Sequence, residues 1–324
     1  MAVFTEVGLV EAEGLARRVG LGAVKALKPI TAGIENTNYF LSTERGEYVL
    51  TLFERLGFEQ LPFYLHLMQH LKQRGIPVPG PQADAQGEIL HRLAGKPAAI
   101  VDRLPGGHAL APAAAHCEQV GAMLARMHLA GASYPRQQPN LRGLPWWDAT
   151  VPLVRPFLSA DQRALIDTEL DFQHELAASA SDAALPRGPV HADLFRDNVM
   201  FVTRPDGLPE LSGFFDFYFA GVDRLAFDIA VCLNDWCIDL PTGRLVEDRA
   251  TAFVSAYEAV RPLTGDERRL LPALMRAAAL RFWVSRLWDH HLPREASTLV
   301  PHDPAHFERV LRQRVALPWH PLPS

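Results

Sequence analysis

The spacing of hydrophobic and polar residues in the first hundred positions is typical of β-strands. Apolar, β-branched and aromatic side chains alternate with polar ones in short runs that turn-forming residues separate. Between these runs, apolar residues recur at every third or fourth position from Leu61 to Leu71, which predicts one helix. The pattern therefore predicts an antiparallel meander with a helix inserted in it. The predicted strands are 26–30, 37–42, 48–53, 88–93 and 97–104.

From residue 112 the apolar residues follow the spacing of amphipathic helices instead. A short hairpin interrupts these helices, with apolar strands at 199–202 and 211–217 around a turn at 203–207. The flexible break Pro105-Gly106-Gly107 separates the two patterns. We therefore expect an α+β fold with a small antiparallel-sheet N-lobe at 1–104 and a larger, mainly helical C-lobe at 105–324. The predicted helices are 112–130, 161–179, 226–237, 244–260, 265–290 and 304–315.

The composition narrows the class of protein. Hydrophobic residues make up 48% and charged residues 21% of the 324 positions, as is usual for a globular enzyme. The net charge of -5 means that the chain has no excess of basic residues for binding a polyanion, so we expect no nucleic-acid partner. No leader pattern and no run of 18 apolar residues occurs, which predicts no membrane partner and a cytoplasmic location. The three cysteines have no C-x-x-C spacing, which argues against disulfides and zinc.

One loop carries the clearest chemical signal. His191-Ala192-Asp193 is followed by Asn198, and Asp216 comes 18 residues later, near the end of the predicted hairpin. This is the layout of a kinase catalytic loop and its metal-binding aspartate. Asp193 would receive the proton of the attacking hydroxyl, and Asn198 and Asp216 would bind Mg²⁺ against the phosphates of ATP. His191 fits better as an orienting hydrogen-bond partner beneath the loop than as a base or a ligand.

Other interpretations of this loop remain. An H-x-D pair also suits a metal-dependent hydrolase, and His191 could simply cap a surface loop. A hydrolase needs further clusters of His or Asp, but His128 and His174 lie in helical patterns and are expected to have no partners. The position of Asp216 favours the kinase interpretation.

Two segments of the N-lobe are candidates for nucleotide binding. Between the first two strands, small and polar side chains would let backbone amides approach phosphates; the candidates are Gly33, Asn36, Thr37 and Asn38. A single glycine is weak evidence, and an ordinary hairpin would look the same. If the break at 105–107 is a hinge, the backbone of 100–103 would face the adenine ring, with Ile100 and Asp102 as its candidate residues.

Taken together, these residues resemble a known family. The loop at 191–198, Phe215-Asp216-Phe217 and the segment 225–230 are similar to the aminoglycoside phosphotransferase and choline kinase superfamily, which has a two-lobed protein-kinase-like fold. Three further segments resemble the phosphotransferase-type homoserine kinases; they are 34–41, 48–54 and 281–287. The resemblance implies Mg²⁺- and ATP-dependent phosphorylation of the side-chain hydroxyl of L-homoserine. The product, O-phospho-L-homoserine, is a precursor of threonine.

Other substrates and one other class stay open. Choline, ethanolamine, an aminoglycoside or a sugar would suit the same chemistry, and Trp146, Trp147 and Trp236 could form an aromatic cage for choline. A nucleotide-binding pseudokinase is a lower-ranked alternative. Such proteins usually lack the catalytic base or a metal ligand, whereas this chain has residues for both roles.

One position departs from the general kinase pattern. The third strand usually carries a lysine that points toward the nucleotide phosphates, but the matching position here is Thr51. A hydroxyl supplies no positive charge. Lys28 is a poorly constrained substitute, so the sequence does not identify the replacement for this lysine.

Three charged residues after the hairpin have expected roles. Asp228 resembles the superfamily aspartate that ties the catalytic loop by hydrogen bonds, although a helix N-terminus also favours a carboxylate. Arg281 and Arg286 are candidate ligands for a substrate carboxylate. Five residues of helix separate them by about 140°, so both cannot point straight into one small pocket. Arg286 shares a helix face with Asp289, and structural ion pairing is the alternative.

Overall fold

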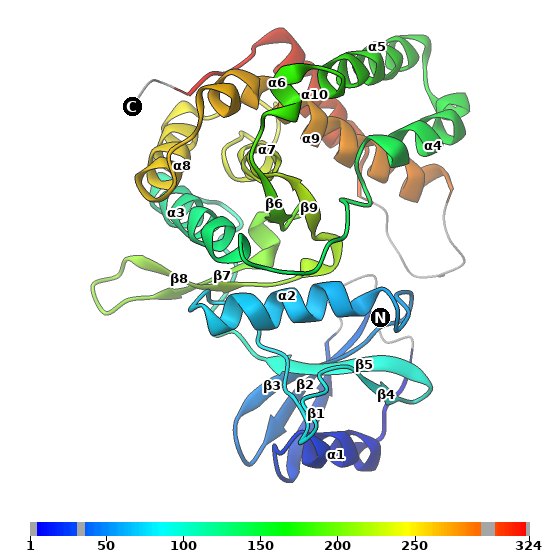
Figure 1. Ribbon diagram of the computed structural model, residues 1–324, viewed down its shortest axis with the longest axis vertical. Coiled ribbons are helices and arrows are strands. Elements are labelled where there is room, and N and C mark those ends of the chain that lie inside the picture. Colours follow the sequence, from blue (N-terminus) through cyan, green and yellow to red (C-terminus); the bar gives the residue numbers. More distant parts are fainter. Residues whose placement is uncertain (1–4, 31–35, 293–301, 322–324) are drawn as a thin grey trace. The chain divides into compact units, whose positions relative to one another are not determined.

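The computed structural model describes residues 5–30, 36–292 and 302–321. The chain forms two compact units (Figure 1). Unit 1 comprises Met1–Pro105 and Ser212–Tyr218, and unit 2 comprises Gly106–Leu211 and Phe219–Ser324. The class predicted from the sequence is confirmed, since an N-terminal antiparallel sheet is followed by a mainly helical region.

Unit 1 contains a five-stranded antiparallel sheet in the order β1-β2-β3-β5-β4. Along β2, every second side chain is buried, as the alternation of apolar and polar residues predicts. In the register of the sheet, Leu50 of β3 lies opposite Ile100 of β5. The strands are β1 (Val24–Pro29), β2 (Thr37–Thr43), β3 (Glu47–Leu52), β4 (His91–Leu93) and β5 (Lys96–Asp102).

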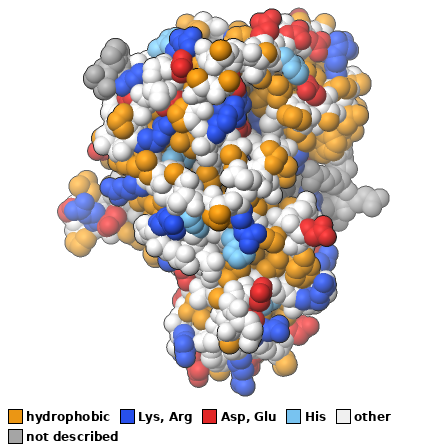
Figure 2. Space-filling model, viewed as in Figure 1, with side chains coloured by type: hydrophobic (Ala, Val, Ile, Leu, Met, Phe, Trp, Pro, Cys, Tyr) orange, Lys and Arg blue, Asp and Glu red, His pale blue; other side chains and the backbone are white. Residues whose placement is uncertain are grey.

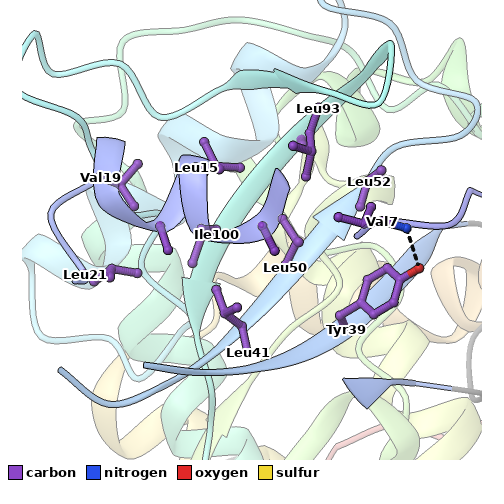
Figure 3. Packing of buried hydrophobic residues seen from close by; sticks show 13 residues of the cluster. Val7, Leu15, Val19, Leu21, Tyr39, Leu41, Leu50, Leu52, Leu93 and Ile100 are labelled. Atoms are coloured by element: carbon purple, nitrogen blue, oxygen red, sulfur yellow. Dashed lines mark hydrogen bonds between the residues drawn. The ribbon is translucent and has the colours of Figure 1, made fainter. Parts of the chain in front are cut away.

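The core of unit 1 lies between the sheet and α1 (Leu9–Arg18). Figure 3 shows Leu15 of α1 and Val19 beside it facing Leu41, Leu50 and Ile100 of the sheet, all of which are buried. The backbone N–H of Val7 donates to the Tyr39 hydroxyl at 3.1 Å and fixes the segment that enters α1. A second helix, α2 (Leu61–Gln73), lies on the opposite side of the sheet from α1 (Figure 1).

Unit 2 is built around the long helix α9. This helix packs against α4, α5, α7 and α10, while α3 packs along α8. The helices are α3 (Ala114–Gly131), α4 (Leu144–Val154), α5 (Ala160–Ala177), α6 (Ala180–Ala183), α7 (Leu225–Trp236), α8 (Glu247–Val260), α9 (Gly265–His291) and α10 (Ala305–Ala316). The strand β6 (Arg187–Val190) pairs antiparallel with β9 (Gly221–Arg224). A second two-stranded sheet joins β7 (Val199–Thr203) to β8 (Pro209–Phe214), whose last residues, from Ser212, belong to unit 1.

The predicted elements are present with shifted limits. The six helices predicted after residue 112 begin and end within a few residues of α3, α5, α7, α8, α9 and α10. The predicted strand 88–93 is shorter, because only His91–Leu93 pairs with a neighbour. The predicted strand 211–217 ends at Phe214, and the chain then turns through a short 3-10 helix at Phe217–Phe219. The helices α1 and α4, the short α6 and the pair β6–β9 were not predicted.

Charges of both signs are mixed on the surface visible in Figure 2, and the cysteines lie in the interior. On the face shown in Figure 2, positive and negative side chains are interspersed and do not gather into one basic area. Among the described residues, no helix combines the length and the apolar character that crossing a membrane requires. Cys117, Cys232 and Cys237 are buried free thiols.

Two helical glycines give a matched test of packing. A Cβ at Gly121 of α3 would lie 2.1 Å from the Phe253 carbonyl oxygen of α8, whereas a Cβ at Gly14 of α1 would meet nothing within 4 Å. We expect Gly121→Ala to destabilise the protein by about 1–3 kcal/mol, because the two helices must move apart. Gly14→Ala should stabilise it by up to about 1 kcal/mol, because alanine favours the helix. Calorimetric unfolding of both variants should therefore show shifts of opposite sign, and a stable Gly121→Ala would contradict the close packing.

Candidate active site

The catalytic loop, residues 191–198, is held at its start by one buried carboxylate. The Asp228 oxygens accept from the backbone N–H of His191 at 2.6 Å and of Ala192 at 2.7 Å. Ala192 has a φ of 62°, a left-handed conformation that costs energy for any residue with a side chain. Because Asp228 lies in the first turn of α7, that helix dictates the shape of the loop. Asp228 thus makes the type of contact that the sequence suggests for it.

Behind Asp228, a buried hydrogen-bond chain continues to α8. His128 Nε2 lies 3.2 Å from Asp228 Oδ2, and its Nδ1 lies 2.7 Å from the Tyr257 hydroxyl. Burial raises the pKa of Tyr257, so the hydroxyl keeps its proton and donates to Nδ1. His128 therefore bridges the Asp228 carboxylate and the Tyr257 hydroxyl. Arg261 completes the chain by donating to the Tyr257 oxygen at 3.1 Å.

These contacts correct one prediction from the sequence. His128 and His174 were expected to lack partners, but His128 contacts Asp228 and Tyr257, and His174 lies 2.7 Å from Asp148. Each partner is distant in the sequence, so no local pattern signals it. His128 lies on an otherwise apolar, buried helix face, which hints at a polar partner, whereas the exposed His174 gives no such hint.

The other end of the catalytic loop is also fixed to α7. Asp235 Oδ2 accepts from Arg196 N at 2.8 Å and from Arg196 Nε at 3.1 Å. Burial raises the pKa of Asp235, while the Arg196 guanidinium opposes that shift. The Trp236 indole N–H donates to the Leu194 carbonyl at 3.0 Å, and Arg196 Nη1 donates to the Leu110 carbonyl at 3.0 Å. The two ends of α7 therefore form a rigid platform for the loop.

Asp193 lies in the loop, between these two anchors. Its backbone N–H donates to His191 Nδ1 at 3.3 Å, so His191, which is fully buried, supports the loop from below. The Asp193 side chain is 16% exposed and lies 3.6 Å from Arg281 Nη1. A supported carboxylate with one accessible edge can accept a proton from a bound hydroxyl.

Asn198 and Asp216 carry oxygen donors that suit Mg²⁺. Asn198 Nδ2 donates to the Asp193 carbonyl at 2.8 Å, which directs the amide oxygen away from that contact. Asp216 supplies a carboxylate, at a backbone position with a φ of 66°. No group of three or more His, Cys, Asp or Glu side chains in the described residues could form a metal cage by itself. Mg²⁺ usually completes its coordination with water and substrate phosphates, so a metal role for either residue does not require a protein cage. Asn198 belongs to unit 2 and Asp216 to unit 1.

The candidate phosphate-binding residues in the described part of unit 1 already make contacts within the protein. Gly33 lies outside the described residues. The Thr37 hydroxyl donates to Glu54 at 2.7 Å, and the Asn38 amide oxygen accepts from the Thr51 hydroxyl at 2.7 Å. The Asn36 carbonyl accepts from Asn38 Nδ2 at 3.4 Å. Thr51 therefore stabilises the second strand, and the residue that replaces the usual lysine remains unidentified.

The two candidates near the predicted hinge are also engaged. Ile100 is buried in the core of unit 1, and its carbonyl accepts from Gln82 N at 2.8 Å. The Asp102 carboxylate accepts from Gly80 N at 3.0 Å and from Gln82 Nε2 at 2.9 Å, and it pairs with Lys72 at 3.2 Å. These contacts account for both residues structurally, so their contact with a nucleotide stays a prediction.

The aromatic residues considered for a choline cage have other roles. Trp147 and Trp236 are fully buried core side chains, and Trp236 binds the catalytic loop. The Trp146 ring is stacked by the Arg142 guanidinium, whose carbon lies 4.5 Å from the ring centroid. Buried indoles cannot form the walls of a cage for a quaternary ammonium.

Comparison with known proteins identifies the family. The family model described as a phosphotransferase enzyme family matches residues 26–263. A homoserine kinase of Polaromonas naphthalenivorans is 63% identical over 319 residues, which cover 98% of this chain and 99% of that protein. A homoserine kinase of Ralstonia pickettii is 60% identical over 320 residues, which cover 97% and 96%. The chain belongs to the homoserine kinases. It is therefore a phosphotransferase enzyme.

The fold of this homoserine kinase family member is shared by more distant structures. An amicoumacin kinase in complex with AMP-PNP, Ca²⁺ and Ami has a TM-score of 0.69 and 18% identity, and the match covers 95% of this chain and 94% of that one. A choline kinase from Cryptosporidium parvum has a TM-score of 0.67 and 14% identity, with 96% of each chain covered. At these identities the likeness concerns the fold alone.

Arg281 and Arg286 both lie in α9, the central helix of unit 2. Arg281 pairs with Asp193. Arg286 has a pKa lowered by burial, and the neighbouring carboxylates of Asp193, Asp289 and Asp197 oppose that shift. Both candidate arginines thus belong to α9, and one of them, Arg281, pairs with Asp193.

Proposed function

We propose that this enzyme transfers the γ-phosphoryl group of ATP to the side-chain hydroxyl of L-homoserine. The observation that carries the proposal is the identity of 63% with a homoserine kinase across nearly the whole of both chains. The anchored catalytic loop supports it, because Asp193 is fixed by α7 and keeps an accessible edge. The product would be O-phospho-L-homoserine, a precursor of threonine. Use of ATP agrees with the cytoplasmic location expected from the sequence.

In the proposed mechanism, Asp193 accepts the proton of the homoserine hydroxyl as the oxygen attacks the γ-phosphorus. The new oxygen–phosphorus bond forms in line with the bond to the β-phosphate oxygen, which breaks, and ADP leaves with that electron pair. His191 and Asn198 hold the loop around Asp193 through the hydrogen bonds described above. Most of the acceleration would come from positioning and charge stabilisation, and the base would contribute on the order of 10²- to 10⁴-fold.

We assign the metal-binding role to Asn198 and Asp216. Bound Mg²⁺ would neutralise charge that develops on the phosphate oxygens. The Asn198 amide oxygen and the Asp216 carboxylate are hard donors of the type that this ion prefers. For the nucleotide itself, Gly33, Asn36, Thr37, Asn38, Ile100 and Asp102 stay the candidate residues.

A panel of alcohols tests the proposed substrate. A site built for a zwitterionic amino acid leaves buried charges unpaired when either charged group of the substrate is missing. We therefore expect kcat/KM for L-homoserine to exceed that for 4-hydroxybutyrate, 3-aminopropanol and 1,4-butanediol by at least about 10²-fold. A coupled assay of ADP formation measures each value. Equal use of all four alcohols would reject homoserine as the substrate while leaving the phosphotransferase class intact.

A further inference from the structure

Arg281 of α9 pairs with Asp193, whereas Arg286, five residues further along the same helix, forms no ion pair with any described residue. We propose that Arg286 binds the carboxylate of the amino-acid substrate, whereas Arg281 is a positioning residue that holds Asp193. The assignment of Arg286 rests on the proposed function, because it needs a substrate with a carboxylate.

Arg281 is fixed by three contacts. Its Nη1 lies 3.6 Å from Asp193 Oδ1, and its side chain is only 4% exposed. Its guanidinium carbon lies 3.7 Å from the centroid of the Phe282 ring and 4.9 Å from that of Phe219. A guanidinium that packs on two rings cannot turn toward a second carboxylate without leaving the first. Arg281 is therefore suited to orient the base, and it is poorly suited to bind a substrate that comes and goes.

Arg286 is placed differently on the same helix. It lies five residues further along α9, a rise of about 7.5 Å. It is partly buried, and within the described part of the chain it forms no hydrogen bond and no ion pair shorter than 4.0 Å. A partly desolvated guanidinium without a bound anion is energetically unfavourable, and its planar fork matches a carboxylate. A substrate carboxylate would supply the missing partner.

The other charged groups around Arg286 support this choice. The carboxylates that face it belong to Asp193, Asp289, Asp197 and Asp235. A substrate carboxylate entering among these groups needs a nearby cation. Arg196 is committed to Asp235 and Arg281 to Asp193. His302 and His306 also lie near Arg286, but burial lowers the pKa of both, that of His306 to about 4, so both are neutral near pH 7. Of Arg196, Arg281 and Arg286, it is Arg286 that forms no ion pair within the described part of the chain.

Methionine variants of the two arginines separate the roles. Each variant is assayed with L-homoserine and with 3-aminopropanol, which has the hydroxyl and the amine but no carboxylate. For Arg286→Met we expect KM for homoserine to rise on the order of 10²-fold, with kcat/KM for 3-aminopropanol changed no more than a few-fold. For Arg281→Met we expect kcat to fall by a similar factor with both substrates, and the preference for homoserine to remain.

The controls make the test decisive. Arg269→Met alters an exposed arginine of the same helix and should leave both substrates unaffected. If Arg286→Met does not fold, Arg286→Lys serves instead, because lysine keeps the charge but loses the fork, and an intermediate rise in KM for homoserine alone is expected. Loss of homoserine selectivity in Arg281→Met, or equal loss with both substrates in Arg286→Met, would overturn the assignment. If the wild-type enzyme itself shows no preference for homoserine, the proposed function fails instead.

Discussion

Asp193→Asn is expected to lower kcat by on the order of 10²- to 10⁴-fold while the dissociation constant for ATP changes only a few-fold. Asparagine keeps the shape of the side chain. The substitution also leaves the contacts by which Asp228 and Asp235 hold the loop in place. It cannot accept the proton of the attacking hydroxyl, because an amide is a very weak base. The loss should therefore appear in turnover and not in nucleotide binding.

Steady-state kinetics with homoserine, together with calorimetric titration of ATP, separates the two quantities. Asp197→Asn in the same loop is a useful comparison, because its carboxylate has no assigned part in the chemistry. A variant of Asp193 that lost ATP affinity but kept its kcat would move this residue from catalysis to nucleotide binding.

The second large effect concerns the assigned metal ligands. Asp216→Ala should nearly abolish turnover and weaken Mg²⁺-dependent binding of ATP, because the substitution removes a carboxylate from the coordination of a hard dication. Asn198→Ala should act in the same direction but less strongly, since an amide oxygen is a neutral ligand. Measuring kcat and ATP affinity at increasing Mg²⁺ concentration shows whether the loss depends on the metal.

Asp206→Ala is the matched control for Asp216→Ala. Asp206 lies in the turn of the same hairpin, where its half-exposed carboxylate pairs with Arg204. Its removal should leave the dependence on Mg²⁺ unchanged. Wild-type turnover of Asp216→Ala and Asn198→Ala at low Mg²⁺ would contradict the metal assignment.

The spacing of apolar residues along the chain predicted most of the fold, because it determines which side chains of a helix or strand are buried. The alternation in 37–42 became β2, whose alternate side chains are buried, and the apolar spacing from 265 to 290 became α9. The helix α1 escaped prediction because two of its three buried residues are the small Ala12 and Ala16, which give a weak apolar signal. In α4, apolar residues lie all around the helix and include Pro152. Neither the helical nor the strand repeat of apolar residues therefore stands out in its sequence.

The catalytic loop could be predicted because its residue types and their spacing are specific. Most of the residues that hold it in place could not be predicted. Asp228 could be inferred from the resemblance to a superfamily. His128 contacts Asp228 across 100 residues of sequence, and Tyr257 contacts His128 across 129, so only the tertiary structure joins them. The same holds for Ser212–Tyr218, which belongs to unit 1 although its neighbours in sequence belong to unit 2. Side chains that act through long-range packing leave no local pattern.

Direct identification of the phosphorylated product tests the central claim most simply. The purified protein is incubated with Mg²⁺ and ATP together with L-homoserine, choline, ethanolamine or kanamycin, and phosphorus NMR or mass spectrometry detects the phosphate ester. We predict O-phospho-L-homoserine as the main product, with stoichiometric formation of ADP and little ester from the other three alcohols. Preferential phosphorylation of choline, ethanolamine or kanamycin, or no ester from any of them, would contradict the assignment of this chain as an ATP-dependent homoserine phosphotransferase.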